Sequence, residues 1–198
     1  MSETSFRLDV MPFVIATVGE FLALHYWLVL LDLDHFILAN LVLWAGFLTE
    51  RIAVITWIQR IYRPTVGIAS QSTSVARKAV RLFVVTLTEI LIWIVWLWLA
   101  DEVDFWLAGA VLMVLMLAEH SMEMALMKKD RFWKYVGNAR TIFFTVMEVA
   151  GGMAWLYLVR HDAPVWGALA LIVGLGIEHV LQGRQLKPDP SKMMAAAA

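Results

Sequence analysis

Apolar residues form six long runs along the chain, and short polar segments separate them. Each run provides the roughly 20 residues that a helix needs to cross the hydrocarbon core of a membrane. The pattern therefore predicts six membrane-spanning helices. We place these helices at about residues 11–31, 36–59, 81–100, 103–127, 141–159 and 164–182.

The polar segments between the predicted spans alternate in charge. Lys and Arg gather in the connections 60–81 and 128–140 and after residue 183, whereas the three short turns carry Asp and Glu. Because cytoplasmic loops of membrane proteins carry the excess of Lys and Arg, both termini are predicted to be cytoplasmic. The longest polar connection, residues 64–76, is predicted to be a loop on the same side.

The polar residues inside the spans repeat three times. A Thr-x-x-Glu motif is followed after seven residues by Trp-Leu and after thirty residues by a second Glu, next to which stands Arg or His. These residues are Thr17, Glu20, Glu50 and Arg51 in the first copy, Thr86, Glu89, Glu119 and His120 in the second, and Thr145, Glu148, Glu178 and His179 in the third. The three registers match without gaps.

The repeat predicts a fold. We expect an all-α, six-transmembrane-helix bundle built from three repeated helical hairpins with pseudo-threefold symmetry, at about 11–60, 80–128 and 140–183 of a single membrane domain, residues 1–198. With a rise of about 1.5 Å per residue, both glutamates of a hairpin lie roughly 15–20 Å below its turn. All six should share one layer, in the cytoplasmic half of the membrane.

Composition excludes several classes of function. Hydrophobic residues make up 61% of the chain, more than a soluble domain of this length carries. The chain has no cysteine, so it has no disulfide, thiolate metal ligand or thiol nucleophile. Its net charge of −1 provides no positive field for nucleic acid. An aromatic belt is predicted from the tryptophans that lie mostly toward span ends, which are Trp93, Trp96, Trp98, Trp106, Trp133, Trp155 and Trp166.

The glutamates inside the spans are the candidate chemistry. An ionised carboxylate in mid-membrane costs about 2.5–3.5 kcal/mol on insertion scales, so these residues should face the interior and have partners. Glu123 stands one helical turn after Glu119 and adds a seventh carboxylate. One Arg and two His cannot balance seven charges. We therefore expect either protonated carboxyls or a bound multivalent cation.

The ligand types narrow the choice of metal. Carboxylates with imidazoles and no thiol suit iron or manganese better than zinc, and they argue against copper. Dinuclear carboxylate bundles use a Glu from each of two helices and a Glu-x-x-His motif from each of two others, whereas here Glu and His are adjacent. We predict a site for two divalent ions. Its candidate ligands are Glu20, Glu50, Glu89, Glu119, His120, Glu123, Glu148, Glu178 and His179.

The other polar residues of the repeat have supporting roles in this hypothesis. Arg51 cannot ligate a metal, so it is predicted to balance charge through a salt bridge with Glu20 or Glu50, or to hold an anionic substrate group. The repeat threonines, one turn from their glutamates, either hydrogen-bond the ligands or bond only to their own backbone. They are Thr17, Thr86 and Thr145.

These observations predict an integral membrane protein, best explained as a dinuclear iron-type oxidoreductase acting on a lipid or other hydrophobic substrate. The alternative is a proton or divalent-cation transporter or channel that uses the glutamate layer. Transporters commonly use discontinuous helices, and here no proline is interior to a span and only Gly151-Gly152 and Gly174-x-Gly176 suggest a break. Bis-histidine haem ligation through His120 and His179 leaves the glutamates unexplained.

The expected partners follow from these hypotheses. They are the lipid bilayer and a hydrophobic small molecule or a transported cation. Assembly into a homo-oligomer or a larger membrane complex is left open by the sequence.

Overall fold

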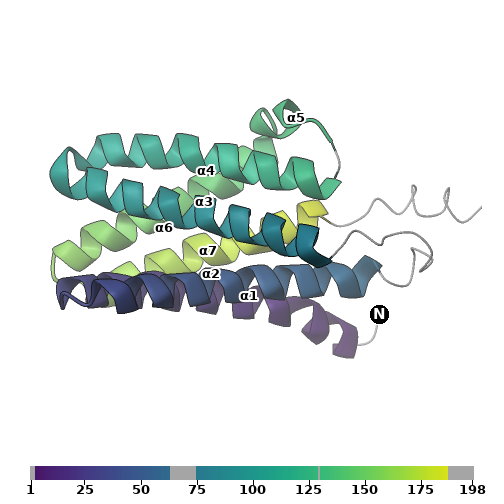
Figure 1. The fold of residues 1–198 in the computed structure, drawn as a ribbon, viewed down its shortest axis with the longest axis horizontal. Helices are drawn as coiled ribbons and strands as arrows, with labels where there is room; N and C mark the ends of the chain where they lie inside the picture. The colour runs from purple at the N-terminus through teal and green to yellow at the C-terminus, as the bar shows by residue number, and fades with distance from the viewer. Residues whose placement is uncertain (1–2, 63–74, 129, 187–198) are drawn as a thin grey trace, which may run out of the picture.

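The computed structural model describes residues 3–62, 75–128 and 130–186, with side chains described over 11–53, 83–126 and 130–184. These residues form seven α-helices and no strand. The helices are α1 (Glu3–Asp32), α2 (Phe36–Tyr62), α3 (Val75–Glu102), α4 (Phe105–Lys128), α5 (Trp133–Val136), α6 (Ala139–Arg160) and α7 (Pro164–Leu186). Figure 1 shows six long helices running side by side, with the short α5 beside α4.

The predicted number of spans is confirmed. Six helices in the described part of the chain are long and apolar enough to cross a membrane. The candidate spans are Met11–Asp32, Phe36–Ala53, Phe83–Glu102, Phe105–Leu126, Ala139–Arg160 and Pro164–Arg184. The chain is therefore a multi-pass helical membrane protein; the cytoplasmic location of its termini remains a prediction from the charge pattern.

Helices α1 and α3 extend furthest beyond the predicted boundaries. Helix α1 starts at Glu3, before the apolar run, and therefore contains Pro12, the second residue of the candidate span. Helix α3 begins at Val75, so the end of the predicted loop 64–76 is helical, while residues 63–74 lie outside the described part. The reason is that apolar runs mark only the section of a helix that lipid surrounds, and backbone hydrogen bonding continues into polar sequence.

The six long helices enclose a common interior. Each long helix packs against the long helices before and after it in the chain, and α7 packs against α1, so the ring closes. The three tight turns lie together at one end of the bundle, opposite the start of α1 (Figure 1). Two of these turns contain an aspartate in the left-handed region, Asp34 with φ 58° and Asp162 with φ 57°.

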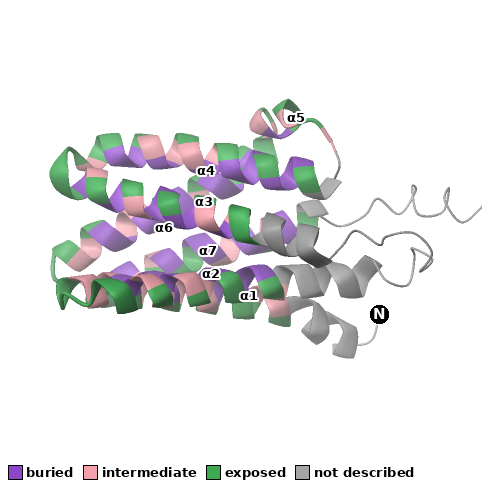
Figure 2. Ribbon diagram, viewed as in Figure 1, coloured by how far each residue is buried: buried purple, intermediate pink, exposed green. Residues whose placement is uncertain are grey.

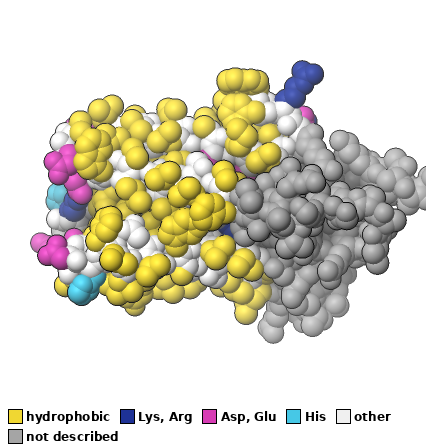
Figure 3. Space-filling model, in the orientation of Figure 1, with side chains coloured by type: hydrophobic (Ala, Val, Ile, Leu, Met, Phe, Trp, Pro, Cys, Tyr) yellow, Lys and Arg dark blue, Asp and Glu magenta, His cyan; other side chains and the backbone are white. Residues whose placement is uncertain are grey.

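The outer and inner surfaces of the bundle differ as expected for a protein in lipid. Large hydrophobic side chains cover the visible outer face, and charged groups gather at the turn end (Figure 3). Buried residues form stripes along the helices (Figure 2). The predicted aromatic belt is only partly correct, because Trp93, Trp96 and Trp155 are fully buried in the core. Trp106 and Trp166, near the turns, are exposed.

The connection between the second and third hairpins contains a short structured segment that the sequence pattern did not predict. Helix α5 lies in this segment, and Asn138 caps the start of α6 by accepting hydrogen bonds from the backbone N–H groups of Arg140 and Thr141. A hydrogen bond from the Lys134 ammonium lowers the pKa of Asp130, which lies outside the spans. These contacts lead the chain into α6 at a defined position.

In the first and the third hairpin, the two helices approach each other closely at a glycine. A Cβ added to Gly174 would lie 2.7 Å from the carbonyl oxygen of Met147 and 2.9 Å from the Cα of Gly151. A Cβ added to Gly46 would lie 2.1 Å from the Cβ of Ala23. Both glycines precede the second glutamate of their hairpin by one turn, so the close approach lies beside the glutamate layer.

The close packing of α6 on α7 gives the first prediction. Gly174→Ala forces two backbones apart, and overpacking of this kind costs about 1–3 kcal/mol. We expect a lower thermal unfolding midpoint of the detergent-solubilised protein. Gly176→Ala is the matched control, because its added Cβ meets only the Thr17 Cγ2 at 3.9 Å. Equal midpoints for the two variants would contradict the packing argument.

Candidate metal centre

All nine predicted ligands are buried in the bundle interior, with exposures between 2% and 7%. Each of the six long helices contributes one glutamate of the repeat. They are Glu20 on α1, Glu50 on α2, Glu89 on α3, Glu119 on α4, Glu148 on α6 and Glu178 on α7. A carboxylate on a lipid-facing surface is energetically costly, so the helices pack with these positions facing the bundle interior.

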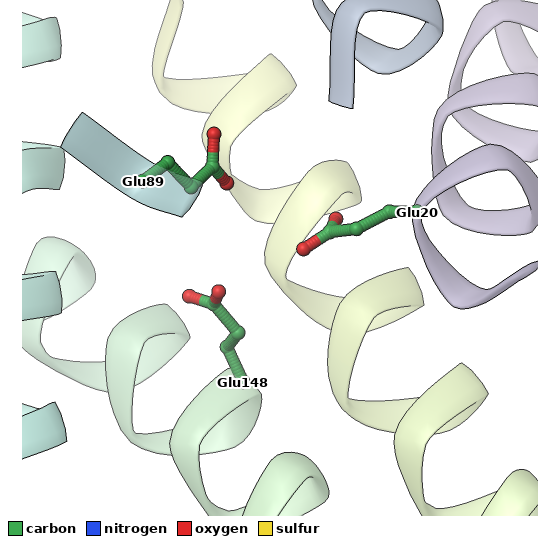
Figure 4. Close-up of side chains that lie close together, drawn as sticks. All are labelled: Glu20, Glu89 and Glu148. Atoms are coloured by element: carbon green, nitrogen blue, oxygen red, sulfur yellow. The ribbon is translucent and has the colours of Figure 1, made fainter. Parts of the chain in front are cut away.

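The first glutamates of the three hairpins converge at the centre. One carboxylate oxygen of each of Glu20, Glu89 and Glu148 lies within 4.8 Å of the other two. Figure 4 shows the three side chains pointing toward one another from α1, α3 and α6. Three buried carboxylates at this separation repel one another unless a proton or a cation lies between them.

Arg51 is surrounded by carboxylates. Its guanidinium contacts Glu50 through Nε at 3.2 Å, Glu89 and Glu119 through Nη2 at 2.6 and 3.1 Å, and Glu123 through Nη1 at 2.5 Å. The predicted salt bridge to Glu50 is therefore present. The other three partners of Arg51 belong to the second hairpin. Among the described residues, Arg51 makes no ion pair with Glu20.

The two histidines lie in similar surroundings. The Nε2 atom of His120 is 3.2 Å from Glu148, 3.8 Å from Glu119 and 3.9 Å from Glu178. Around His179, the ring nitrogens lie 3.4 Å from Glu178, 3.5 Å from Glu20 and 3.6 Å from Glu50.

The surroundings of Arg51, His120 and His179 correspond position by position. Each side chain contacts the glutamate that precedes it in the sequence. Each also contacts both repeat glutamates of the next hairpin, where the first hairpin follows the third. We call these three groups the Arg51 pocket, the His120 pocket and the His179 pocket.

Two of the three repeat threonines, Thr17 and Thr145, bond to histidines rather than to glutamates. Thr145 Oγ1 lies 2.8 Å from His120 Nδ1 and donates its own hydrogen to the backbone carbonyl of Thr141 at 2.8 Å. A hydroxyl has one hydrogen, so His120 Nδ1 must be the donor and the neutral ring has no hydrogen on Nε2. Thr17 Oγ1 lies 3.1 Å from His179 Nδ1.

Several buried polar atoms of the cluster lack a hydrogen bond within the described structure. They include Glu20 Oε1, Glu50 Oε2, Glu119 Oε2, Glu148 Oε2 and Thr86 Oγ1. A small cavity of about 10 Å³, close to the roughly 10–15 Å³ that one water needs, lies inside the cluster. It is lined by Glu20, Glu50, Arg51, Glu89, His120, Glu148, Glu178, His179 and Gln182. The cluster therefore has carboxylate oxygens without a hydrogen bond and room for one small ion.

Sequence reasoning missed one residue of the cluster, Gln182. Its Nε2 donates to Glu123 Oε2 at 2.6 Å, while the other oxygen of Glu123 accepts from Arg51. A signal was present, because Gln182 follows Glu178 by four residues just as Glu123 follows Glu119. Residues four apart share a helix face, so both should point inward. Both oxygens of Glu123 are thus held by protein donors.

No protein-family model, curated protein or solved structure matches the chain. The fold and the site define a multi-pass helical membrane protein with a buried Glu/His cluster that could hold a metal ion.

The surroundings of Arg51 give the second prediction. Arg51→Met removes the cation from four buried carboxylates, and breaking a buried pair in this way costs about 3–5 kcal/mol. We expect a large decrease in the thermal midpoint in detergent. Arg160→Met is the control, because its partner Asp101 is half-exposed at a turn and such pairs contribute about 1 kcal/mol or less. Similar decreases in both variants would show that the cluster does not depend on Arg51.

Proposed function

We propose that the Glu/His cluster is an intramembrane site for two metal ions, iron or manganese, and that the protein is an oxidoreductase acting on a lipid or another hydrophobic substrate. The observation that carries the metal site is the orientation of His120. Because its Nδ1–H is donated to Thr145, a neutral ring presents the Nε2 lone pair to the Glu148 carboxylate. Two acceptors face each other, and a cation between them would resolve the repulsion.

The distances in the His120 pocket fit ligands that share an ion. Two ligand atoms that each lie about 2.1 Å from one ion are about 3 Å apart. Glu148 Oε2 lies 3.2 Å from His120 Nε2 and yet makes no hydrogen bond. A threonine that fixes the other ring nitrogen is the arrangement that metal-binding histidines use.

The His179 pocket supports a second ion of the same kind. His179 is also held by a threonine, and it faces carboxylates of α1, α2 and α7. Glu178 lies 3.9 Å from His120 Nε2 but approaches His179 at Nδ1, so it is assigned to the first ion alone. The proposed ligands are His120, Glu119, Glu148 and Glu178 for one ion and His179, Glu20 and Glu50 for the other. Glu89 and Glu123 are left to Arg51, which Glu50 and Glu119 also contact.

Charge and ligand type support the choice of ion. Seven buried carboxylates exceed the one guanidinium, and two divalent cations would offset most of the remaining charge. The donor set is oxygen and imidazole nitrogen, which suits iron or manganese. Such a pair of ions would supply electron transfer and Lewis acidity. The protein contributes ligands that are buried in an apolar bundle of continuous helices.

The continuous helices favour an enzyme over a transporter. Each candidate span lies within one α-helix, and the glycines that suggested a break lie inside α6 and α7. Gly151 and Gly174 serve close helix packing. Transporters commonly place ion sites at broken helices. A proton or divalent-cation pathway through the glutamates remains the second candidate, supported by the unbroken series of contacts between carboxylates and histidines.

The two histidine pockets give the third prediction. We expect the purified protein, loaded with Fe²⁺ or Mn²⁺, to contain two ions per chain by elemental analysis. His120→Ala and His179→Ala should each reduce the metal content, because each removes one nitrogen ligand. His25→Ala is the control, since His25 stacks on the Phe21 ring and meets the Tyr26 ring edge-on, each with ring centroids 5.7 Å apart.

Three further results decide between the functions. Oxidation of a lipophilic electron donor by the iron-loaded protein supports the enzyme. A haem Soret band would contradict the assignment of both histidines. Absence of bound metal, together with proton flux in liposomes that Glu119→Gln abolishes, would replace the proposal with the transporter.

The threonines give the fourth prediction. Thr145→Val removes the acceptor that fixes His120, and loss of such a partner typically weakens metal binding about 10- to 100-fold. Thr86→Val is the matched control, because the Thr86 hydroxyl has no partner in the described structure. Metal affinity is measured by competition with a chelator. If both valine variants bind metal as tightly as the original protein, the threonine does not orient the ligand.

A further inference from the structure

We infer that the Arg51 pocket is a third metal pocket of the same design, in which the guanidinium takes the place of the ion. This inference rests on the proposed function, because it assumes that the two histidine pockets hold metal. It adds a reason why the chain should bind two ions and not three, and it assigns Arg51 the role of a built-in cation.

The first support is the correspondence of contacts. Arg51 stands where the other hairpins have His120 and His179, next to the second glutamate of the repeat. Its guanidinium contacts the preceding glutamate and both repeat glutamates of the next hairpin, as the two imidazoles do. The carboxylates that form a proposed ion site in the other two pockets are therefore present in the third, and Arg51 fills the space between them.

The second support is independent of the carboxylates. The hydroxyl of Thr86 is buried, with 0% of the residue exposed, and it has no hydrogen-bond partner within the described structure. In the other two hairpins the corresponding threonine contacts a histidine Nδ1. Thr86 therefore occupies the position of the threonine that holds a histidine in the other two pockets, but the Arg51 pocket has no histidine. Its hydroxyl has no hydrogen bond because residue 51 is an arginine and offers no imidazole nitrogen at this place.

The third support explains how one arginine replaces both a ligand and an ion. Arginine stays protonated in proteins, so it supplies one permanent positive charge and ligates nothing. Its charge is weaker than that of a divalent ion, but it has five N–H donors. Glu123 adds a fourth carboxylate at 2.5 Å, and Gln182 holds that carboxylate from its other side.

The inference gives the fifth prediction. Arg51→His should bind a third Fe²⁺ or Mn²⁺ ion, raising the metal content 1.5-fold, because the new imidazole can contact Thr86 and face Glu89 and Glu119. The third ion should also restore stability, so the thermal midpoint of this variant should rise with metal and fall with chelator more steeply than that of the original protein. In Arg51→His with Thr86→Val, the third ion should bind about 10- to 100-fold more weakly.

A reciprocal variant tests the same inference without relying on Arg51→His to fold. His120→Arg places a guanidinium among Glu119, Glu148 and Glu178, the carboxylates that correspond to those of Glu50, Glu89 and Glu119 around Arg51. We expect this variant to keep its fold and to bind one ion fewer than the original protein. The single substitution His25→Arg is the control for an added arginine within a span.

The outcomes separate the inference from the proposed function. Two ions in the original protein and still two in a folded Arg51→His would show that the Arg51 pocket is not a metal pocket, while leaving the metal site intact. No metal in the original protein would overturn both. If neither variant folds with or without metal, the inference also fails, because it requires the three pockets to be interchangeable.

Discussion

Buried negative charge is the constraint on which the rest of this structure depends. Seven glutamates lie inside a bundle whose outer surface is apolar, and the only permanent cation among the described residues of the cluster is Arg51. Burying a carboxylate without a partner is among the most expensive arrangements a membrane protein can contain. The six spans reduce this cost by bringing the glutamates together in one cluster. There the glutamates share a guanidinium, two imidazoles and, in our proposal, two metal ions.

The helix packing serves this layer. Gly46 and Gly174 let the two helices of the first and of the third hairpin approach closely one turn from Glu50 and Glu178, so the carboxylates of neighbouring helices converge. The α3–α4 hairpin has no glycine at the corresponding position, where Leu115 stands. That hairpin supplies three of the four carboxylates around Arg51. The α3–α4 hairpin therefore differs from the other two both in its helix packing and in the additional carboxylate of Glu123.

Much of the site was predictable because the informative residues are rare. A glutamate within a membrane span is costly to expose to lipid, so its side chain is expected to face the bundle interior. The inward orientation of Glu20, Glu89 and Glu148 followed from this cost and from their spacing. Gln182 was missed because a neutral amide carries no such cost and does not stand out. The fully buried Trp93 and Trp96 were placed in a belt because composition cannot distinguish a tryptophan that faces lipid from one that faces the core.

The sequence by itself determined the number of spans, the three copies of the motif and the gathering of the glutamates, because helix length and charge in lipid are strong local constraints. Only the tertiary structure decided which groups pair. It paired Arg51 with carboxylates of the second hairpin and joined His120 to Thr145, and it left the Thr86 hydroxyl without a hydrogen bond in the described part of the chain. These pairings depend on which hairpin lies next to which, and that order is set by side-chain packing between helices, which no local pattern records.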